Sequence, residues 1–342
     1  MLCALIMAGG CGSRFWPQST VDKPKQFLKL INDKTMLQLT YDRINKLIPT
    51  EKIFIAVNQK YMGLVKEQLP FIKEENIISE PCSKNTAPCI LLSSLYIKNM
   101  LGETNIVCAS SDSYIKKENL FIEKIKCASE FLNNNKDAIV TLGITPTRPE
   151  TGYGYIKYKQ KKYIPYKVIK FVEKPNLDKA KEYISSNEYL WNAGIFVFNN
   201  ISMINEFKNN VEDEYNLLKD LPFVNDKKYN VYLNQNYVKC QKISIDYAVI
   251  EKSANVYTIP SDIGWDDIGT WVSLIRYLKE DKFGNVIKGH VKLINSCNNI
   301  VYGNGKKIIL LNVENLCCID SDDVIIIGRR EDLNQVHTLN DD

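Results

Sequence analysis

The first thirty residues combine glycines and positive charges in a pattern that could bind a chain of phosphates. The apolar run Leu2–Met7 has the length of a buried strand, and the glycine-rich segment 8–14 (AGGCGSR) follows it at once. Because glycine has no Cβ, its backbone N–H groups can approach a ligand closely. Arg14 and Lys25 add two positive charges beside this turn. The pattern predicts a polyphosphate-binding turn.

Two better-known phosphate-binding motifs do not fit this segment. A Walker loop requires a lysine followed by Ser or Thr after its second glycine, and neither stands at that spacing. The dinucleotide fingerprint requires a third glycine, whereas Phe15 follows Gly10 and Gly12 at that place. A tight turn with an incidental arginine is the alternative for the glycines alone. The order Arg14, Pro24, Lys25 favours phosphate binding.

Two aspartates far apart in the sequence are candidate metal ligands. Asp112 follows the apolar run 105–109, and an aspartate at the carboxyl end of a central strand is a typical ligand for a hard cation. A single aspartate is weak support for a metal site, because a second carboxylate ligand is needed. Asp266 and Asp267 supply adjacent carboxylates between glycines, and the neighbouring tryptophans indicate partial burial. We expect Asp267 to be the partner of Asp112.

The loop of residues 80–89 (EPCSKNTAPC) has two interpretations that the residues leave open. It joins a short strand to a helix that opens near Pro88, where a first-turn proline is favourable. Asn85 or Thr86 could serve only as the cap of that helix. Amide and backbone groups in the same loop could equally bind the edge of a purine base.

Polar residues later in the chain suit a sugar phosphate. Gly152 and Gly154 would let the backbone approach a sugar, or they mark the edge of a hairpin. The Glu173 carboxylate suits sugar hydroxyls and the Lys174 ammonium suits a phosphate, with a surface ion pair as the alternative. Two further candidates are Asn192, beside an apolar strand, and Asp246, in the first turn of a helix, where its charge could simply complement the helix dipole.

The elements around these residues predict an α/β fold. Buried strands are expected at 52–57, 77–79, 105–109 and 137–142, and helices at 34–47 and 62–69. This alternation predicts a doubly wound, mostly parallel, Rossmann-like sheet, with ligands beyond the carboxyl ends of its strands.

The texture of the sequence changes at about Asn285. Short β runs separated by turn residues follow, with no helical pattern, which predicts a small all-β domain of solenoid or roll type. Its role could be purely structural, covering a sheet edge or making a dimer contact. We therefore expect a catalytic domain at 1–284 and a β domain at 285–342.

The composition narrows the class of protein. The 342 residues are 45% hydrophobic and 25% charged, as in ordinary globular proteins, and the net charge of +4 gives no case for nucleic acid. No apolar run is long enough to cross a membrane, and no signal peptide is expected. The ten cysteines are scattered, without a Cys-x-x-Cys pair, which favours reduced thiols and a cytoplasmic location. Two histidines leave little room for a zinc site or a histidine-based nucleophile.

Taken together, the motifs resemble those of the nucleotidylyltransferases that make nucleotide sugars, and among these the bacterial mannose-1-phosphate guanylyltransferases. The resemblance covers nearly the whole chain. It rests on nine segments that stand in the family's order: Met7–Arg14, Pro24–Leu28, Glu80–Pro81, Asn85–Pro88, Ser111–Asp112, Phe171–Pro175, Trp191–Ile195, Ile245–Ala248 and Gly264–Gly269.

The resemblance implies a role for each candidate residue. Catalysis would involve Arg14, Lys25, Asp112 and Asp267, with Asp112 and Asp267 holding Mg²⁺. The nucleotide would be bound by Ala8, Gly9, Gly10, Gly12, Ser13, Glu80, Asn85, Thr86, Ala87 and Ser111. The sugar phosphate would be bound by Gly154, Glu173, Lys174, Asn192 and Asp246.

The implied reaction transfers GMP from GTP to mannose 1-phosphate with Mg²⁺, giving GDP-mannose and pyrophosphate. The late β segment resembles the family's short left-handed β-helix, so a homodimer formed through it is expected. Longer members carry an isomerase domain, and no isomerase activity is expected from this chain. Two alternatives remain: a related enzyme that uses another nucleoside triphosphate or another hexose or heptose 1-phosphate, and a nucleotide-sugar sensor without turnover.

Overall fold

The computed structural model describes residues 1–10 and 14–339. They form two compact units, each assembled from separate stretches of the chain. The first contains residues 1–9 and 40–266, and the second contains residues 10–39 and 267–342. This division differs from the boundary expected at residue 284, because segment 10–39 packs with the C-terminal residues. Each unit is described by itself.

Four parallel strands form one half of the main sheet in the first unit, as the alternating pattern predicts. Their order is β3-β2-β1-β4. The central strand β1 is almost wholly buried because both of its neighbours and both faces of the sheet are covered. The bounds are β1 (Leu2–Met7), β2 (Ile53–Asn58), β3 (Ile77–Glu80) and β4 (Asn105–Ser110).

The other half of this nine-stranded sheet is mixed, which corrects the expectation of a mostly parallel sheet. The order continues β9-β6-β10-β8-β7, and β9 runs antiparallel to both β4 and β6. A strand buried on both faces reads as the same apolar run in either direction, so its sequence does not encode its orientation. The bounds are β6 (Ile139–Ile144), β7 (Tyr155–Tyr158), β8 (Tyr166–Val172), β9 (Tyr189–Asn199) and β10 (Val256–Pro260).

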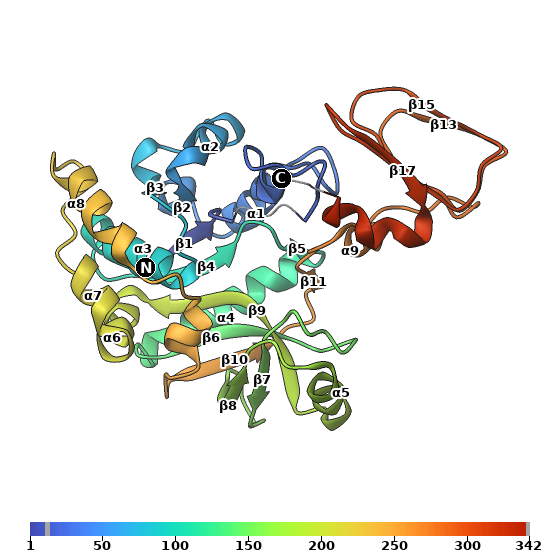
Figure 1. Cartoon of the computed structure of the whole chain (residues 1–342). Coiled ribbons are helices and arrows are strands. Elements are labelled where there is room, and N and C mark those ends of the chain that lie inside the picture. Colours follow the sequence, from blue (N-terminus) through green and yellow to red (C-terminus); the bar gives the residue numbers. More distant parts are fainter. Residues whose placement is uncertain (11–13, 340–342) are drawn as a thin grey trace. The chain divides into compact units, whose positions relative to one another are not determined.

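Helices flank this sheet (Figure 1). The most buried is α3, where eleven consecutive residues from Ala87 to Ile97 are buried, since it is apolar around its whole circumference. The bounds of the helices and short elements, α3 included, are α1 (Met36–Asn45), which begins in the second unit, α2 (Met62–Gln68), α3 (Thr86–Leu101), β5 (Tyr114–Ile115), α4 (Glu118–Asn134), α5 (Leu177–Ser186), α6 (Asn200–Asn210), α7 (Glu212–Leu218), α8 (Tyr229–Asn236), the π-helical turn η6 (Asp246–Ile250) and β11 (Trp265–Asp266).

The C-terminal part of the second unit is built mainly from short, stacked strands. Strands β12, β14 and β16 pair in parallel, β17 closes that sheet in the antiparallel direction, and β13 pairs in parallel with β15. Asparagines seventeen residues apart hydrogen-bond from one layer to the next, Asn295 with Asn312 and Asn298 with Asn315. The bounds are β12 (Val286–Lys288), β13 (Val291–Ile294), β14 (Ile300–Tyr302), β15 (Ile308–Leu311), β16 (Leu316–Asp320) and β17 (Ile325–Arg329). The stacking fits the expected small β domain.

Two helical segments accompany these strands. Helix α9 (Trp271–Ile275) begins with a capping box between Thr270 and Ser273. The 3₁₀ helix η7 (Arg330–Thr338) follows β17 and buries Leu333 and Val336. The expectation that no helix follows Asn285 is therefore wrong. Two buried apolar residues among polar ones give too weak a period to be recognised in the sequence.

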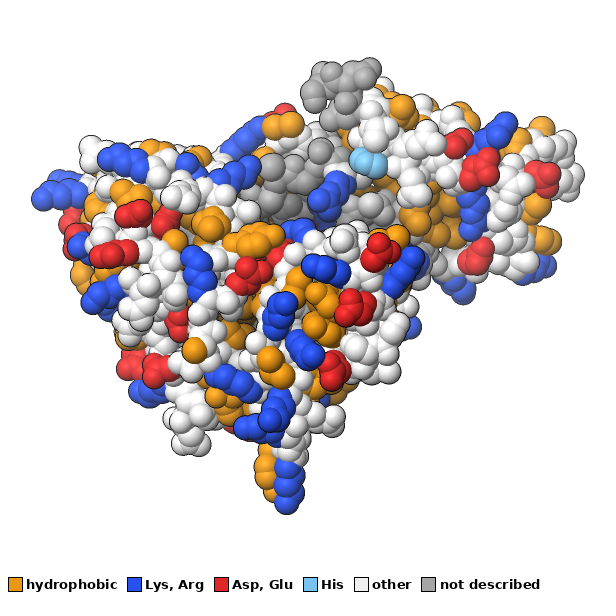
Figure 2. All heavy atoms as spheres, turned by 60° about the horizontal axis from the view of Figure 1, so that its bottom comes forward, with side chains coloured by type: hydrophobic (Ala, Val, Ile, Leu, Met, Phe, Trp, Pro, Cys, Tyr) orange, Lys and Arg blue, Asp and Glu red, His pale blue; other side chains and the backbone are white. Residues whose placement is uncertain are grey.

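The surface of the described residues is mixed in character. Figure 2 shows acidic, basic and apolar side chains side by side over the viewed face. Within residues 1–10 and 14–339, no helix has both the length and the apolar composition required to cross a bilayer. The described cysteines are all free thiols, and most of them are buried.

Candidate active site

The predicted phosphate-binding turn begins directly at the end of β1. Ala8 is buried, and its N–H donates to the carbonyl of Ala56 at 2.7 Å. A Cβ built on Gly9 would lie 2.8 Å from Oε2 of Glu80, whereas one built on Gly10 would meet no atom of residues 1–10 and 14–339 within 4 Å. Gly9 thus allows close packing against Glu80, and Gly10 has no described atom beside its Cα on the side where a Cβ would stand. The predicted ligands Gly12 and Ser13 lie outside the described residues.

The Glu80 carboxylate is buried at the end of β3 and held by a side chain that sequence reasoning did not select. The hydroxyl of Tyr237 donates to Oε1 of Glu80, and Tyr237 is itself completely buried. Removal from water raises the pKa of Glu80 to about 7, although the bond from Tyr237 acts in the opposite direction. Glu80 therefore carries a carboxyl group that changes charge near neutral pH.

The loop before α3 is tied to the segment that leads to Asp246. The side chain of Asn85 caps the helix by accepting from the N–H of Thr86 at 2.8 Å. The Thr86 hydroxyl accepts from the N–H of Ile245 at 2.8 Å, and Ala87 N–H donates to the Ile243 carbonyl at 3.1 Å. The structure therefore confirms the capping role of Asn85. A role in binding a base stays a prediction.

The five residues predicted to bind a sugar phosphate come together in the first unit. Asn192 joins two of them, because its N–H donates to the Gly154 carbonyl at 2.8 Å and its amide donates to Oδ1 of Asp246 at 3.0 Å. The Thr141 hydroxyl fixes the same amide by donating to its oxygen at 2.8 Å. A Cβ on Gly154 would lie 2.6 Å from Oε2 of Glu173 and 3.1 Å from the Phe171 ring, so a larger residue here would have to displace the Glu173 carboxylate.

The same cluster contains an ion pair between Lys174 and Glu173 and a carboxyl group, Asp246, with a raised pKa. Lys174 Nζ lies 2.7 Å from Oε1 of Glu173, with the carboxylate 8% and the ammonium side chain 59% exposed. The Glu173 carboxylate raises the pKa of Lys174. Burial, followed by the negative charge of Glu173, raises the pKa of Asp246 to about 7. An exposed cation thus stands beside a group of carboxyl and amide side chains.

Asp112 lies just beyond the carboxyl end of β4, where the sequence predicted it. The hydroxyl of Ser110 donates to its Oδ1. The neighbouring Ser111 is buried and is held by its N–H, which donates to the Met7 carbonyl at 3.0 Å. The Thr40 hydroxyl donates to the Ser111 carbonyl at 3.2 Å. The predicted metal ligand is therefore carried on a fixed stretch of backbone beside β1.

The second unit brings together the other three predicted catalytic residues. Lys25 is buried, and its ammonium lies 3.6 Å from Oδ1 of Asp267 and donates to the Asp267 carbonyl at 2.5 Å. Arg14 is exposed. Its Nη1 and the Oδ2 of Asp267 each lie 3.5 Å from the point where a Cβ built on Gly269 would stand, so both side chains border Gly269. Over its described residues, neither unit holds a group of three or more His, Cys, Asp or Glu side chains arranged for a metal ion.

Unusual backbone angles coincide with the predicted site. Asparagine adopts positive φ with little strain. Lys174 (φ 46°) and the buried, β-branched Ile268 (φ 44°) also have positive φ, and for these residue types this conformation costs free energy. Asn85 has φ 69° and ψ −170°, a region that glycine normally occupies. The other non-glycine residues with positive φ in the described ranges are all asparagines, most of them at turns of the β domain. Strain is thus concentrated beside Lys174, Asp267 and the loop before α3.

Comparisons with known proteins identify the family of the chain. A family model described as Nucleotidyl transferase matches residues 3–282, most of the chain. The chain belongs to the nucleotidyl transferase family.

Relatives and a solved structure of this family cover the chain almost completely. A mannose-1-phosphate guanylyltransferase 2 of Escherichia coli O157:H7 is 35% identical, over 99% of this chain and 72% of the relative. A mannose-1-phosphate guanylyltransferase of Salmonella muenchen is 35% identical, over 99% of this chain and 73% of the relative. A crystal structure from Thermus thermophilus, named a mannose-1-phosphate geranyltransferase, is 30% identical with a TM-score of 0.86 and covers 99% of this chain and 98% of that one. The chain is thus a nucleotidyltransferase enzyme.

In this nucleotidyltransferase, the two adjacent aspartates of the predicted metal motif have different environments. The Asp266 carboxylate is 5% exposed and lies 3.7 Å from Nη2 of Arg148, whereas Asp267 is 37% exposed. The Tyr153 hydroxyl donates to Asp266 at 3.5 Å, and Arg148 lies over the ring of Trp191 at 5.1 Å. Arg148 was not among the residues predicted from the sequence. The one feature of the sequence that could have pointed to it is its position a few residues before Gly152 and Gly154.

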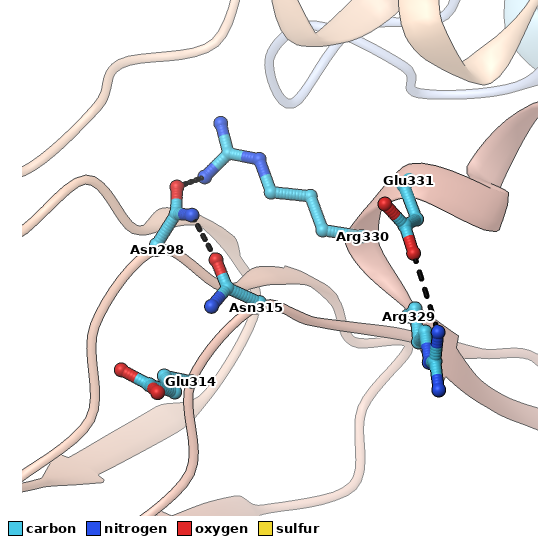
Figure 3. A pocket seen from close by; sticks show the side chains of 6 residues that line it. All are labelled: Asn298, Glu314, Asn315, Arg329, Arg330 and Glu331. Atoms are coloured by element: carbon cyan, nitrogen blue, oxygen red, sulfur yellow. Dashed lines mark hydrogen bonds and ion pairs between the residues drawn. The ribbon is translucent and has the colours of Figure 1, made fainter.

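A hollow of about 580 Å³ lies in the β domain, apart from the family motifs (Figure 3). Arg330 is engaged there by the Asn298 side chain and by the Gly284 carbonyl at 2.8 Å. Arg329 lies 3.5 Å from Oε1 of Glu331. These charges are balanced within the protein, so the hollow gives no indication of a ligand. It is lined by Asn298, Glu314, Asn315, Arg329, Arg330 and Glu331.

Proposed function

We propose that this enzyme transfers GMP from GTP to mannose 1-phosphate, giving GDP-mannose and pyrophosphate. The observation that carries the proposal is the cluster of Gly154, Glu173, Lys174, Asn192 and Asp246, which suits a polar sugar with an attached phosphate. The names of the relatives at 35% identity support GTP and mannose 1-phosphate as the substrates.

The nucleotide is bound in this proposal by backbone and by one carboxyl group. Among the described residues, no atom lies within 4 Å of a Cβ built on Gly10, which suits close approach of phosphates to the backbone. Ala8, Gly9, Gly12, Ser13 and Ser111 belong to the same phosphate-binding set, and Asn85, Thr86 and Ala87 to the base-binding set. In its ionised form, Glu80 suits guanine in particular, because the N–H groups on the Watson–Crick edge of guanine can donate hydrogen bonds to a carboxylate.

The chemical step is an in-line displacement. A phosphate oxygen of mannose 1-phosphate forms a bond to the α-phosphorus of GTP, while the bond from that phosphorus to the β-phosphate bridging oxygen breaks and pyrophosphate leaves. The attacking phosphate is largely ionised at neutral pH, so no general base is required. Arg14 and Lys25 stabilise the charge that develops on pyrophosphate, and Lys174 holds the phosphate of the sugar.

Asp112 and Asp267 suit Mg²⁺ chemically, because both offer carboxylate oxygens that are partly accessible to solvent. The buried Asp266 is the less suitable member of the pair, since Arg148 and Tyr153 already engage it. We assign Asp112 and Asp267 as the residues that would hold the ion. When bound, Mg²⁺ would neutralise charge on the phosphates during transfer.

Three further features belong to the proposal. The parallel layers of the β domain suit a short left-handed β-helix. A homodimer formed through this domain is supported by exposed apolar side chains on its strands: Ile309, Leu311, Ile325 and Ile327. The free thiols suit the reducing cytoplasm.

Pyrophosphate release tests the function directly. The purified protein is assayed with Mg²⁺, four nucleoside triphosphates and a panel of hexose and heptose 1-phosphates. Release with GTP and mannose 1-phosphate well above all other pairs supports the proposal. Preference for another pair would retain the reaction and replace the substrates. Absence of release from folded protein that still binds GTP would favour the nucleotide-sugar sensor.

A further inference from the structure

The turn that carries Lys25 is attached to the β domain at several points in the second unit. Residues Lys25–Phe27 form a single 3₁₀ turn (η1), closed by the Leu28 N–H, which donates to the Lys25 carbonyl at 3.0 Å. Its middle residue, Gln26, is held by its amide, which donates to the Gly10 carbonyl at 2.7 Å. The backbone that follows, at Lys29 and Leu30, has its partners more than 250 residues later in the chain.

Lys288 and Tyr302 hold this following backbone. The Lys288 ammonium donates to the carbonyls of Lys29 and Leu30, the latter at 2.9 Å. The Tyr302 hydroxyl donates to the Lys29 carbonyl at 2.8 Å and lies 2.9 Å from the Lys288 nitrogen. The same ammonium lies 4.7 Å from the centre of the Tyr302 ring. Two side chains of neighbouring β-domain strands thus satisfy two adjacent carbonyls.

Edge-on aromatic contacts through Trp271 of helix α9, and a hydrogen bond to β16, hold the part of segment 10–39 that precedes Lys25. Trp271 donates from Nε1 to the Trp16 carbonyl at 3.0 Å and contacts the rings of Phe15 and Tyr302 edge-on at 5.3 and 5.0 Å. Gln18 donates to the Asp320 carbonyl at 2.5 Å. Because Tyr302 takes part both in these aromatic contacts and in the Lys288 contact, the β domain holds the segment on both sides of Lys25.

We propose that Lys288 and Tyr302 are positioning residues for nucleotide binding: by holding the carbonyls of Lys29 and Leu30, they fix the turn that presents Lys25 to the triphosphate. This inference rests on the proposed role of Lys25. It gives the β domain a function within the chain itself, separate from any contact between subunits. Neither residue contacts a substrate in this scheme.

The test compares three variants of the full-length protein. Lys288→Met keeps the length of the side chain and removes its donors, and Tyr302→Phe keeps the ring and removes one hydroxyl. Lys292→Ala, at an exposed lysine of the same domain, is the control. Lys288→Met is expected to raise KM for GTP about tenfold, with a much smaller change in KM for the sugar phosphate, because only the triphosphate contact loses its geometry. Lys288→Arg, which restores donors, should recover part of this loss.

Amide hydrogen exchange of residues 24–33 supplies a readout that does not depend on turnover. Exchange is expected to be faster in Lys288→Met and Tyr302→Phe than in the parent or Lys292→Ala, with oligomeric state unchanged. Unaltered exchange together with an unaltered KM for GTP would overturn the proposal. Equal increases in the KM values for GTP and for the sugar phosphate would indicate a general structural role and would overturn the proposal too.

If Lys288→Met does not fold, Tyr302→Phe decides by the same criteria. If the parent protein releases no pyrophosphate, the proposed transferase function is rejected. The exchange rates of residues 24–33 then still show whether Lys288 and Tyr302 hold the turn that carries Lys25.

Discussion

The ammonium of Lys25 lies 3.6 Å from Oδ1 of Asp267 and donates to the carbonyl of the same residue at 2.5 Å. Lys25 is almost completely buried, so its charge requires compensation within the protein, to which the Asp267 carboxylate contributes. The two residues are 242 positions apart in the sequence. Lys25 and Asp267 are therefore joined within the second unit, and a change in one residue is expected to affect the other.

Substitution of the adjacent aspartates should separate catalysis from stability. Asp267→Asn is expected to lower kcat about 100-fold and to raise the Mg²⁺ concentration needed for half-maximal rate, because a neutral amide is a poor ligand. Asp266→Asn should instead reduce the free energy of unfolding by about 1–2 kcal/mol, since it breaks the ion pair with Arg148. Mg²⁺ titrations and urea unfolding measure the two effects. Matching Mg²⁺ titrations for Asp267→Asn and the parent would show that the metal assignment is wrong.

Adding a methyl group at Gly10 should affect the ligand and leave the free protein intact. The new Cβ meets no atom of the described residues within 4 Å, so the melting temperature is expected to stay within about 2 °C of the parent. KM for GTP should rise at least about tenfold, because the methyl group occupies the space where phosphates approach the backbone. Gly63→Ala, where a new Cβ likewise meets no described atom within 4 Å, is the control. An unchanged KM in Gly10→Ala would contradict backbone binding at this turn.

The raised pKa of Glu80 predicts a pH dependence of stability. The folded protein keeps the proton of Glu80 up to about pH 7, whereas the unfolded chain releases it at its ordinary value of 4.5. Folding therefore takes up a proton between these values, and the contribution of Glu80 to the free energy of unfolding falls as pH rises from about 4.5 to 7.

Glu80→Gln should lack this fall, because its amide is neutral at every pH. Relative to Glu80→Gln, the parent is expected to lose on the order of 3 kcal/mol between pH 4.5 and 7.5, as measured by urea unfolding. Asp246, whose pKa is also raised, is present in both proteins and cancels in the comparison. Parallel stability curves for the two proteins would refute the prediction.

Removal of the Lys174 ammonium should affect one substrate far more than the other. Lys174→Ala is expected to raise KM for the sugar 1-phosphate about 30-fold and to change KM for GTP less than about threefold, because an exposed cation that binds the sugar phosphate is lost. Lys170→Ala, at an exposed lysine of strand β8, is the matched control. Steady-state kinetics with each substrate varied in turn provide the comparison. Equal effects on both KM values would exclude the assigned contact.

Sequence reasoning reached furthest where the constraint is local. The parallel strands of the first half of the sheet, and Asp112 just beyond the carboxyl end of β4, could be predicted from the sequence. The apolar run of a strand and the polar residue that follows it lie in one short stretch of chain, so both are visible locally. The five residues predicted to bind a sugar phosphate span positions 154–246; they were assigned through the resemblance to the family, and the structure brings them together. The orientation of β9 had no such signature, because an apolar run buried on both faces reads alike in both directions.

The sequence by itself determined the order of the motifs, the α/β class and the candidate ligands. Tertiary structure alone decided that Asp266 is buried beside Arg148 while Asp267 faces Lys25, that Tyr237 holds Glu80, and that segment 10–39 packs with the C-terminal residues. The physical reason is the same in each case. Burial and hydrogen-bond partnership depend on residues tens to hundreds of positions away, and no local periodicity records which distant side chain will satisfy a buried charge.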